Sequence, residues 1–211
     1  MPTRKDNLRF WGHEYDWSDG GHSWTNGDEW WQRVLDGTLG KYQPENARVL
    51  EIGPGAGRFT DEILKRDPQH VTLVDLAPKC LELCKERFAD QLDKLTFIQN
   101  DGAGVPTVPD ESIDFVFSFD VFVHIEKPEL SKYFEDFARV LAPGAVGVVH
   151  YATIERAQSE DIQEGWRADY RSTDMMELMD RLGMEVLEDF YHPQLSHTNT
   201  SLVMFRRPAG A

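Results

Sequence analysis

Three glycines at alternating positions are the residues of this 211-residue chain whose spacing says most about its chemistry. Gly53, Gly55 and Gly57 follow an apolar run at 48–53 and precede a segment with helical spacing at 59–66. Glycine permits positive φ and close approach of a ligand to the backbone, and a helix amino terminus favours anions. The pattern is Gly-x-Gly-x-Gly, whereas the dinucleotide fingerprint is Gly-x-Gly-x-x-Gly. The turn predicts a cofactor site without selecting the cofactor.

Two further polar positions follow the next predicted strands. Asp75 lies at the end of the run 70–76, where a carboxylate can accept both hydroxyl hydrogens of a ribose. Asp101 and Gly102 follow the run 95–100, where a carboxylate can accept from an adenine amine and a glycine amide can approach the ring. The order of these three positions favours a nucleoside-containing cofactor over solvated loop residues.

Histidine is the usual general base near neutral pH, and two histidines follow later strands. His124 comes shortly after the run 113–120, and His150 lies near the end of the run 145–151. Asp120 can orient His124 or bind a substrate hydroxyl. Buried core or helix-cap histidines are the alternative interpretation. The three residues form no tight ligand cluster, so we expect no catalytic metal.

Strands and helices alternate along the chain from Arg48 onward. Strands are predicted at 48–53, 70–76, 95–100, 113–120, 145–151, 185–191 and 201–207, and helices at 59–66, from Pro78 to 88, at 128–141 and at 173–183. This alternation predicts an α/β fold: a Rossmann-like, mostly parallel seven-stranded sheet with helices on both faces and an antiparallel closing strand. Ligands of such sheets bind beyond the carboxyl ends of the strands.

Residues 1–46 have a different composition and hold five of the six tryptophans. Their periodicity is weak until about Gly27, so we expect an irregular aromatic-rich cap ahead of the main domain at 47–211. The tryptophans either cover one edge of the core or form a flap over the site. Tyr15 in this cap, with Trp166 and Arg167 later in the chain, are candidates for contacts to the substrate.

The ordered motifs EIGPGAG, VDLAP, QNDG, FSFDVFVHI and LAPGA resemble those of class I S-adenosylmethionine-dependent methyltransferases. The resemblance implies S-adenosyl-L-methionine as the cofactor. It places the three glycines at the methionine part, with Glu51 at the amino group. Asp75 and its neighbour Leu76 would hold the ribose, and Asp101 with Gly102 the adenine. The methionine end would also meet residues from Ser118 through Phe119 to Asp120.

A narrower likeness concerns the acceptor. The segment W-G-x-x-Y-D-W-S, with DFVFSFDVFVHIE, resembles methyltransferases of bacterial surface-polysaccharide and sugar-modification clusters. It implies O-methylation of a sugar or sugar-linked group, with N- or O-methylation of another small metabolite as the alternative. A nicotinamide-dependent oxidoreductase is disfavoured by the glycine spacing. A non-catalytic interaction protein with the same fold remains a distant alternative.

Composition limits the partners that we expect. The formal net charge of −15 disfavours nucleic acid and anionic membrane surfaces and leaves a small-molecule or glycan acceptor. The polar first ten residues lack the apolar stretch of a secretory signal, and no apolar run predicts membrane insertion. Cys80 and Cys84 fall within one predicted helix, which suits small core thiols and a reducing cytoplasm. The oligomeric state stays open.

Overall fold

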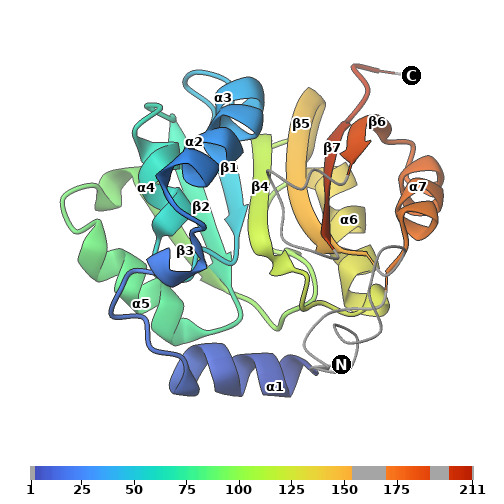
Figure 1. The fold of residues 1–211 in the computed structure, drawn as a ribbon. Coiled ribbons are helices and arrows are strands. Elements are labelled where there is room, and N and C mark those ends of the chain that lie inside the picture. The colour runs from blue at the N-terminus through green and yellow to red at the C-terminus, as the bar shows by residue number, and fades with distance from the viewer. Residues whose placement is uncertain (1–2, 154–169, 191–199, 211) are drawn as a thin grey trace.

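A seven-stranded sheet forms the centre of the computed structural model, which describes residues 3–153, 170–190 and 200–210 (Figure 1). The strand order is β3-β2-β1-β4-β5-β7-β6, and β7 runs antiparallel to both of its neighbours. The strands are β1 (Arg48–Ile52), β2 (His70–Asp75), β3 (Leu95–Gln99), β4 (Ile113–Phe122), β5 (Leu141–Ala152), β6 (Glu185–Phe190) and β7 (Thr200–Arg206). The predicted Rossmann-like sheet with an antiparallel closing strand is confirmed.

Helices cover both faces of this sheet. They are α1 (Arg4–Arg9), α2 (Asp28–Gly37), α3 (Leu39–Tyr42), α4 (Arg58–Leu64), α5 (Pro78–Arg87), α6 (Lys127–Val140) and α7 (Ser172–Arg181). Side chains of α2 to α5 share one apolar core with the sheet, and those of α6 and α7 share a second core on the opposite face. None of the helices in the described ranges is long and apolar enough to cross a membrane.

The helix predicted at 128–141 is α6, which ends at Val140, one residue before the predicted end. Pro143 and Gly144 follow this end, and Leu141 already has the extended backbone of β5. The register then shifts: Leu141 pairs with Ile113, whereas Val146 pairs with Phe115. Such a bulge accommodates proline and a glycine with positive φ inside a strand, so the two residues also interrupt the ladder of β5 with β4.

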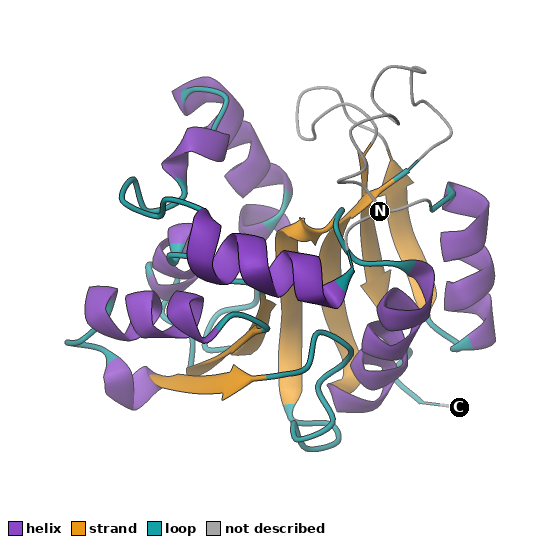
Figure 2. Ribbon diagram, turned by 90° about the horizontal axis from the view of Figure 1, so that it is seen from below, coloured by secondary structure: helices purple, strands orange, loops and turns teal. Residues whose placement is uncertain are grey.

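The beginning of the chain is more regular than predicted. Helix α1 starts at a capping box, in which Thr3 Oγ1 accepts from the Asp6 amide (3.2 Å) and Asp6 accepts from the Thr3 amide (3.0 Å). A π-helical turn, Phe10–Glu14, continues it. Figure 2 views the molecule from the end where β1 and β4 terminate and shows α1 lying across the strands. Local capping and this docking outweigh the weak periodicity of the segment.

Candidate active site

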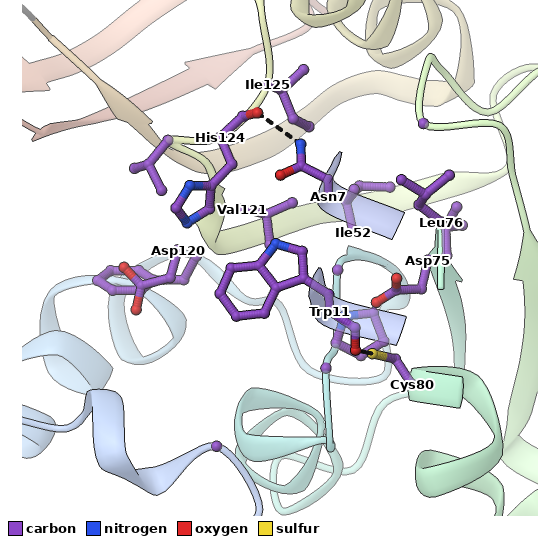
Figure 3. Close-up of a pocket in the computed structure, with 18 of the residues that line it drawn as sticks. Asn7, Trp11, Ile52, Asp75, Leu76, Cys80, Asp120, Val121, His124 and Ile125 are labelled. Atoms are coloured by element: carbon purple, nitrogen blue, oxygen red, sulfur yellow. Dashed lines mark hydrogen bonds between the residues drawn. The ribbon is translucent and has the colours of Figure 1, made fainter. Parts of the chain in front are cut away.

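A cavity of about 370 Å³ lies at the carboxyl ends of β1, β2 and β4 and is roofed by α1 and the segment after it (Figure 3). The sheet brings these strand ends together because β1 pairs in parallel with both β2 and β4. Side chains and glycines from all three strand ends therefore face one space, as the ligand rule for open sheets predicts.

The predicted glycine turn forms one wall of this cavity. Gly53 has φ of +70° and Gly55 has φ of +57°. A Cβ atom on Gly55 would lie 2.8 Å from the Trp17 ring, and one on Gly53 would lie 2.3 Å from a Val121 methyl carbon. Both the conformation and the close approach therefore require glycine here. Gly57, with φ of +84°, completes the turn at the start of α4.

Asp75 and Leu76 line the cavity where β2 ends. One carboxylate oxygen of Asp75 accepts from the Ala77 amide at 2.8 Å. Burial raises the pKa of Asp75 to about 6, while hydrogen bonds from the Ala77, Gly55 and Leu76 amides oppose that rise. The side chain can thus be ionised at neutral pH and accept hydrogen bonds from a ligand.

Glu51 and Ser118 lie behind the glycine turn, and both are buried. Thr60 Oγ1 donates to Glu51 at 2.7 Å, and Ser118 Oγ donates to the Ile52 carbonyl at 2.9 Å. Burial raises the pKa of Glu51 to about 8, with the nearby Asp75 charge adding to the rise. In this structure the two side chains support the wall, and their predicted contact with the cofactor stays a prediction.

The two residues predicted to contact adenine, Asp101 and Gly102, lie in different environments. Gly102 lines the cavity, whereas the side chain of Asp101 is 74% exposed. Asp101 is paired with Arg4 of α1 at 3.2 Å and also accepts from the Ala103 amide at 3.0 Å. Arg4 therefore occupies the carboxylate that we expected to meet adenine, and it ties α1 to the loop after β3.

Asp120 stands at an irregularity of β4. Its φ is +61°, and the pairing of β4 with β5 shifts register between Ser118 and Phe122. Positive φ is costly for a non-glycine residue and is often found at functional sites. The distortion brings Asp120 to the cavity wall, where its carboxylate lies 3.0 Å from Arg58 and 3.1 Å from His150 Nδ1.

Arg58 also lines the cavity, although it was not among the residues predicted to form the site. Its side chain is only 8% exposed, and a second nitrogen donates to Thr25 Oγ1 at 3.2 Å. The guanidinium carbon lies 5.3 Å from the Trp31 ring centre and 4.9 Å from that of Phe59. Its position directly after Gly57, at the first turn of α4, was the available signal.

The two candidate histidines take different places. His124 lines the cavity, and its ring centre lies 5.4 Å from that of Trp11. His150 is fully buried and stacks on Phe119 with ring centres 4.3 Å apart. Phe119 itself lines the cavity, so His150 lies behind the cavity wall. His150 contacts Asp120, which also lines the cavity.

Aromatic rings of the amino-terminal segment form much of the roof. Trp11, Trp17 and Trp24 line the cavity, and Trp17 Nε1 donates to the Trp11 carbonyl at 2.9 Å. Tyr15 packs against Trp17 with ring centres 4.6 Å apart and shares a hydrogen bond with Ser23. Trp166 and Arg167 lie outside the described residues.

Two other predictions concern sulfur and metal. Cys80 and Cys84 are buried free thiols near the glycine turn, and burial raises the pKa of both far above its usual range. Across the residues that the structure describes, no group of three or more His, Cys, Asp or Glu side chains is arranged to hold a metal ion.

Residues 49–144 match a family model described as a methyltransferase domain. Curated relatives include a sterol 24-C-methyltransferase of Gibberella zeae, 30% identical over 56% of this chain and 31% of the relative. A malonyl-[acyl-carrier protein] O-methyltransferase of Methylococcus capsulatus is 29% identical over 59% of this chain and 44% of the relative. Phosphoethanolamine N-methyltransferase 1 of Triticum aestivum is 31% identical over 46% of this chain and 19% of the relative. The chain thus spans less than half the length of each.

Solved structures share the fold at low identity. An S-adenosylmethionine-dependent methyltransferase from Mesorhizobium loti superposes with a TM-score of 0.69 at 16% identity, over 86% of this chain and 99% of that one. The [4+2]-cyclase SpnF superposes with a TM-score of 0.75 at 16% identity, over 100% of this chain and 98% of the cyclase. Because a cyclase shares it, this fold by itself does not specify methyl transfer.

The family match at 49–144 and the glycine turn with Asp75 agree with each other. The part of the chain at 49–144 is therefore similar to methyltransferase domains, and the chain shares the fold of an S-adenosylmethionine-dependent methyltransferase.

Proposed function

We propose that this chain is a class I S-adenosylmethionine-dependent methyltransferase, with S-adenosylmethionine as its cofactor, that O-methylates a hydroxyl of a sugar or sugar-linked group in polysaccharide or glycan biosynthesis. The observation that carries the proposal is that His124 and Asp120 face the same cavity as the glycine turn and Asp75. A base thus stands near the cofactor, as transfer to a hydroxyl requires. The tryptophan rings of the roof offer flat apolar faces on which a sugar ring can stack.

The residues of the cavity and its wall would have different roles in the reaction. When bound, S-adenosylmethionine supplies the methyl group from its sulfonium centre. His124 would take the hydroxyl proton, since imidazole is an effective base near neutral pH. Asp120, whose carboxylate pairs with Arg58 and whose backbone amide donates to His150 Nδ1, would bind a neighbouring hydroxyl and orient the acceptor. His150 would act as a positioning residue because it is fully buried behind Phe119.

Residues 1–46 would serve as the cap of this site. Trp17 lies on Gly55 and Arg4 pairs with Asp101, so the segment touches both ends of the predicted cofactor site. A roof of this kind excludes water from the reacting atoms. It would also have to open for cofactor and acceptor to enter.

An amine of another small metabolite is the second candidate acceptor. Glu126 and Glu129 line the cavity together with Trp11 and Trp24, and Glu129 also lies 3.6 Å from Arg4. Carboxylates and indole rings that line one cavity suit a cationic ligand. The similarity to a wheat phosphoethanolamine N-methyltransferase supports the same direction. An amine needs only to be neutral to accept the methyl group, so His124 would matter less.

The test begins with calorimetric titration of S-adenosylhomocysteine and continues with an acceptor screen. Nucleotide sugars and free glycans form one panel, and phosphoethanolamine with other small amines forms the second, with mass spectrometry detecting the added methyl group. Methylated sugars whose formation fails in His124→Ala support the proposal. Methylation confined to the amine panel would replace it with the second candidate, and no binding of S-adenosylhomocysteine would argue against catalysis.

A further inference from the structure

Asn7 is a polar residue of α1 on the cavity wall, and its side-chain amide has a defined orientation. The residue is 8% exposed, and its Nδ2 donates to the His124 carbonyl at 3.0 Å. A carbonyl oxygen only accepts hydrogen bonds, so the NH₂ group must face His124. The amide oxygen is thereby turned away from that carbonyl, and Figure 3 shows it on the side of Val121 and the Trp11 indole.

This oxygen is buried and accepts no hydrogen bond from any residue that the structure describes. Leaving a buried acceptor without a donor is unfavourable, and such groups in folded proteins are commonly satisfied by a ligand or an ordered water. An apolar residue of similar size would avoid this cost but would lose the bond to the His124 carbonyl. The oxygen without a donor thus points to a hydrogen-bond donor that enters the cavity.

The place of Asn7 along the roof indicates which part of the cavity this donor occupies. Arg4 lies over Gly102 at one end of the predicted cofactor site, and Trp17 lies over Gly55 at the other. Asn7 comes between them in the chain, donates to the His124 carbonyl and lines the same cavity as Ile52 (Figure 3). Asn7 therefore belongs to the cavity wall between these two contacts of the roof, where cofactor and acceptor have to meet.

We propose that the side-chain oxygen of Asn7 accepts a hydrogen bond from a hydroxyl or amine hydrogen of the molecule bound in the cavity. Both the cofactor and the acceptor carry such hydrogens, and the bond would orient whichever of them supplies it. If the acceptor supplies the hydrogen, the inference rests on the proposed function. If the cofactor supplies it, no particular acceptor is required.

The experiment compares the wild-type protein with Asn7→Leu, which replaces the amide by an apolar group of similar volume. Asn7→Ala is a second variant in case the first is unstable, and circular dichroism checks the folding of each. Arg9→Leu is the matched control, since Arg9 lies on the same helix with its side chain 62% exposed. Calorimetry measures the Kd of S-adenosylhomocysteine, and steady-state kinetics measures KM and kcat on any sugar or amine that the screen identifies.

A roughly tenfold weaker Kd for S-adenosylhomocysteine in Asn7→Leu, with Arg9→Leu unchanged, assigns the bond to the cofactor. An unchanged Kd for S-adenosylhomocysteine, with KM for the acceptor about tenfold higher and kcat nearly unchanged, assigns the bond to the acceptor. A fall in kcat alone would reflect loss of the Nδ2 bond to the His124 carbonyl and would contradict the proposal. If neither value changes, the oxygen binds water only and the proposal is wrong. Should the wild-type protein methylate no compound of either panel, the proposed acceptor has failed, and the calorimetric comparison alone decides the role of Asn7.

Discussion

Nη2 of Arg58 lies 3.0 Å from Oδ2 of Asp120, and the two side chains are 8% and 19% exposed. Arg58 begins α4 and Asp120 lies in β4, 62 positions further along the chain. This ion pair joins the glycine turn to the side of the cavity where the acceptor is proposed to bind. Because both side chains are largely buried, removing either one would leave the charge of the other poorly compensated.

Replacing Arg58 with Met should lower the free energy of unfolding by up to about 3 kcal/mol, since the Asp120 carboxylate would lose its nearest cation. Urea denaturation at neutral pH measures the change. The double variant Arg58→Met/Asp120→Asn should recover much of the loss, because the charge that needed compensation is gone. Equal destabilisation in the single and double variants would mean that Arg58 acts through its packing on Trp31 and Phe59.

Replacing Asp75 with Ala should weaken binding of S-adenosylhomocysteine by about 1.5–3 kcal/mol, the usual worth of hydrogen bonds to a charged group. Isothermal titration calorimetry at pH 7.5 measures the difference. Leu76 lines the same wall but offers no acceptor, so Leu76→Ala controls for lost packing. An Asp75→Ala variant that binds as tightly as the wild-type protein would move the ribose site elsewhere.

Binding of S-adenosylhomocysteine should depend on pH through Asp75. Its pKa in the free protein is about 6, and the ionised form is the better acceptor for ribose hydroxyls. Affinity should therefore be nearly constant from pH 7 to 7.5 and fall below pH 6, approaching tenfold per pH unit. Titrations at several pH values test this, and Asp75→Asn should bind weakly with a flatter profile. An affinity that rises as the pH falls would contradict the assignment.

Replacing His124 with Ala should slow methylation of a hydroxyl acceptor by about 10²–10⁴-fold and leave cofactor affinity nearly intact. His150→Ala is the informative comparison, since His150 lies behind the cavity wall and has a larger role in packing. That variant should lose thermal stability as well as activity. Near-normal turnover of His124→Ala would remove His124 as the base.

Replacing Glu51 with Gln should change how stability depends on pH. Burial raises the pKa of Glu51 to about 8, above its ordinary value, so the folded state holds a proton that the unfolded state releases. Stability from this group is present below the unfolded pKa and is lost as pH rises towards 8. The Gln variant should therefore melt higher than the wild-type protein at pH 8–9, by roughly 2–4 °C per kcal/mol, with little difference near pH 4. A melting difference independent of pH would contradict the assigned pKa.

The sequence alone determined the sheet, its antiparallel closing strand and the wall formed by the glycine turn and Asp75. These features depend on residues close together in the chain: apolar runs with strand periodicity, glycines at positive φ, and a carboxylate at a strand end. The capping box from Thr3 to Asp6 was equally local, and it was the available signal for the helix that we expected to be irregular.

Only the tertiary structure decided which of the remaining side chains meet. The register of β4 against β5 places Asp120 beside His150, and the packing of α4 brings Arg58 to the same carboxylate. Docking of α1 places Asn7 against His124, 117 positions away, and leaves Asp101 exposed and paired with Arg4. Contacts over such separations arise from strand register and helix packing, which no short stretch of sequence encodes.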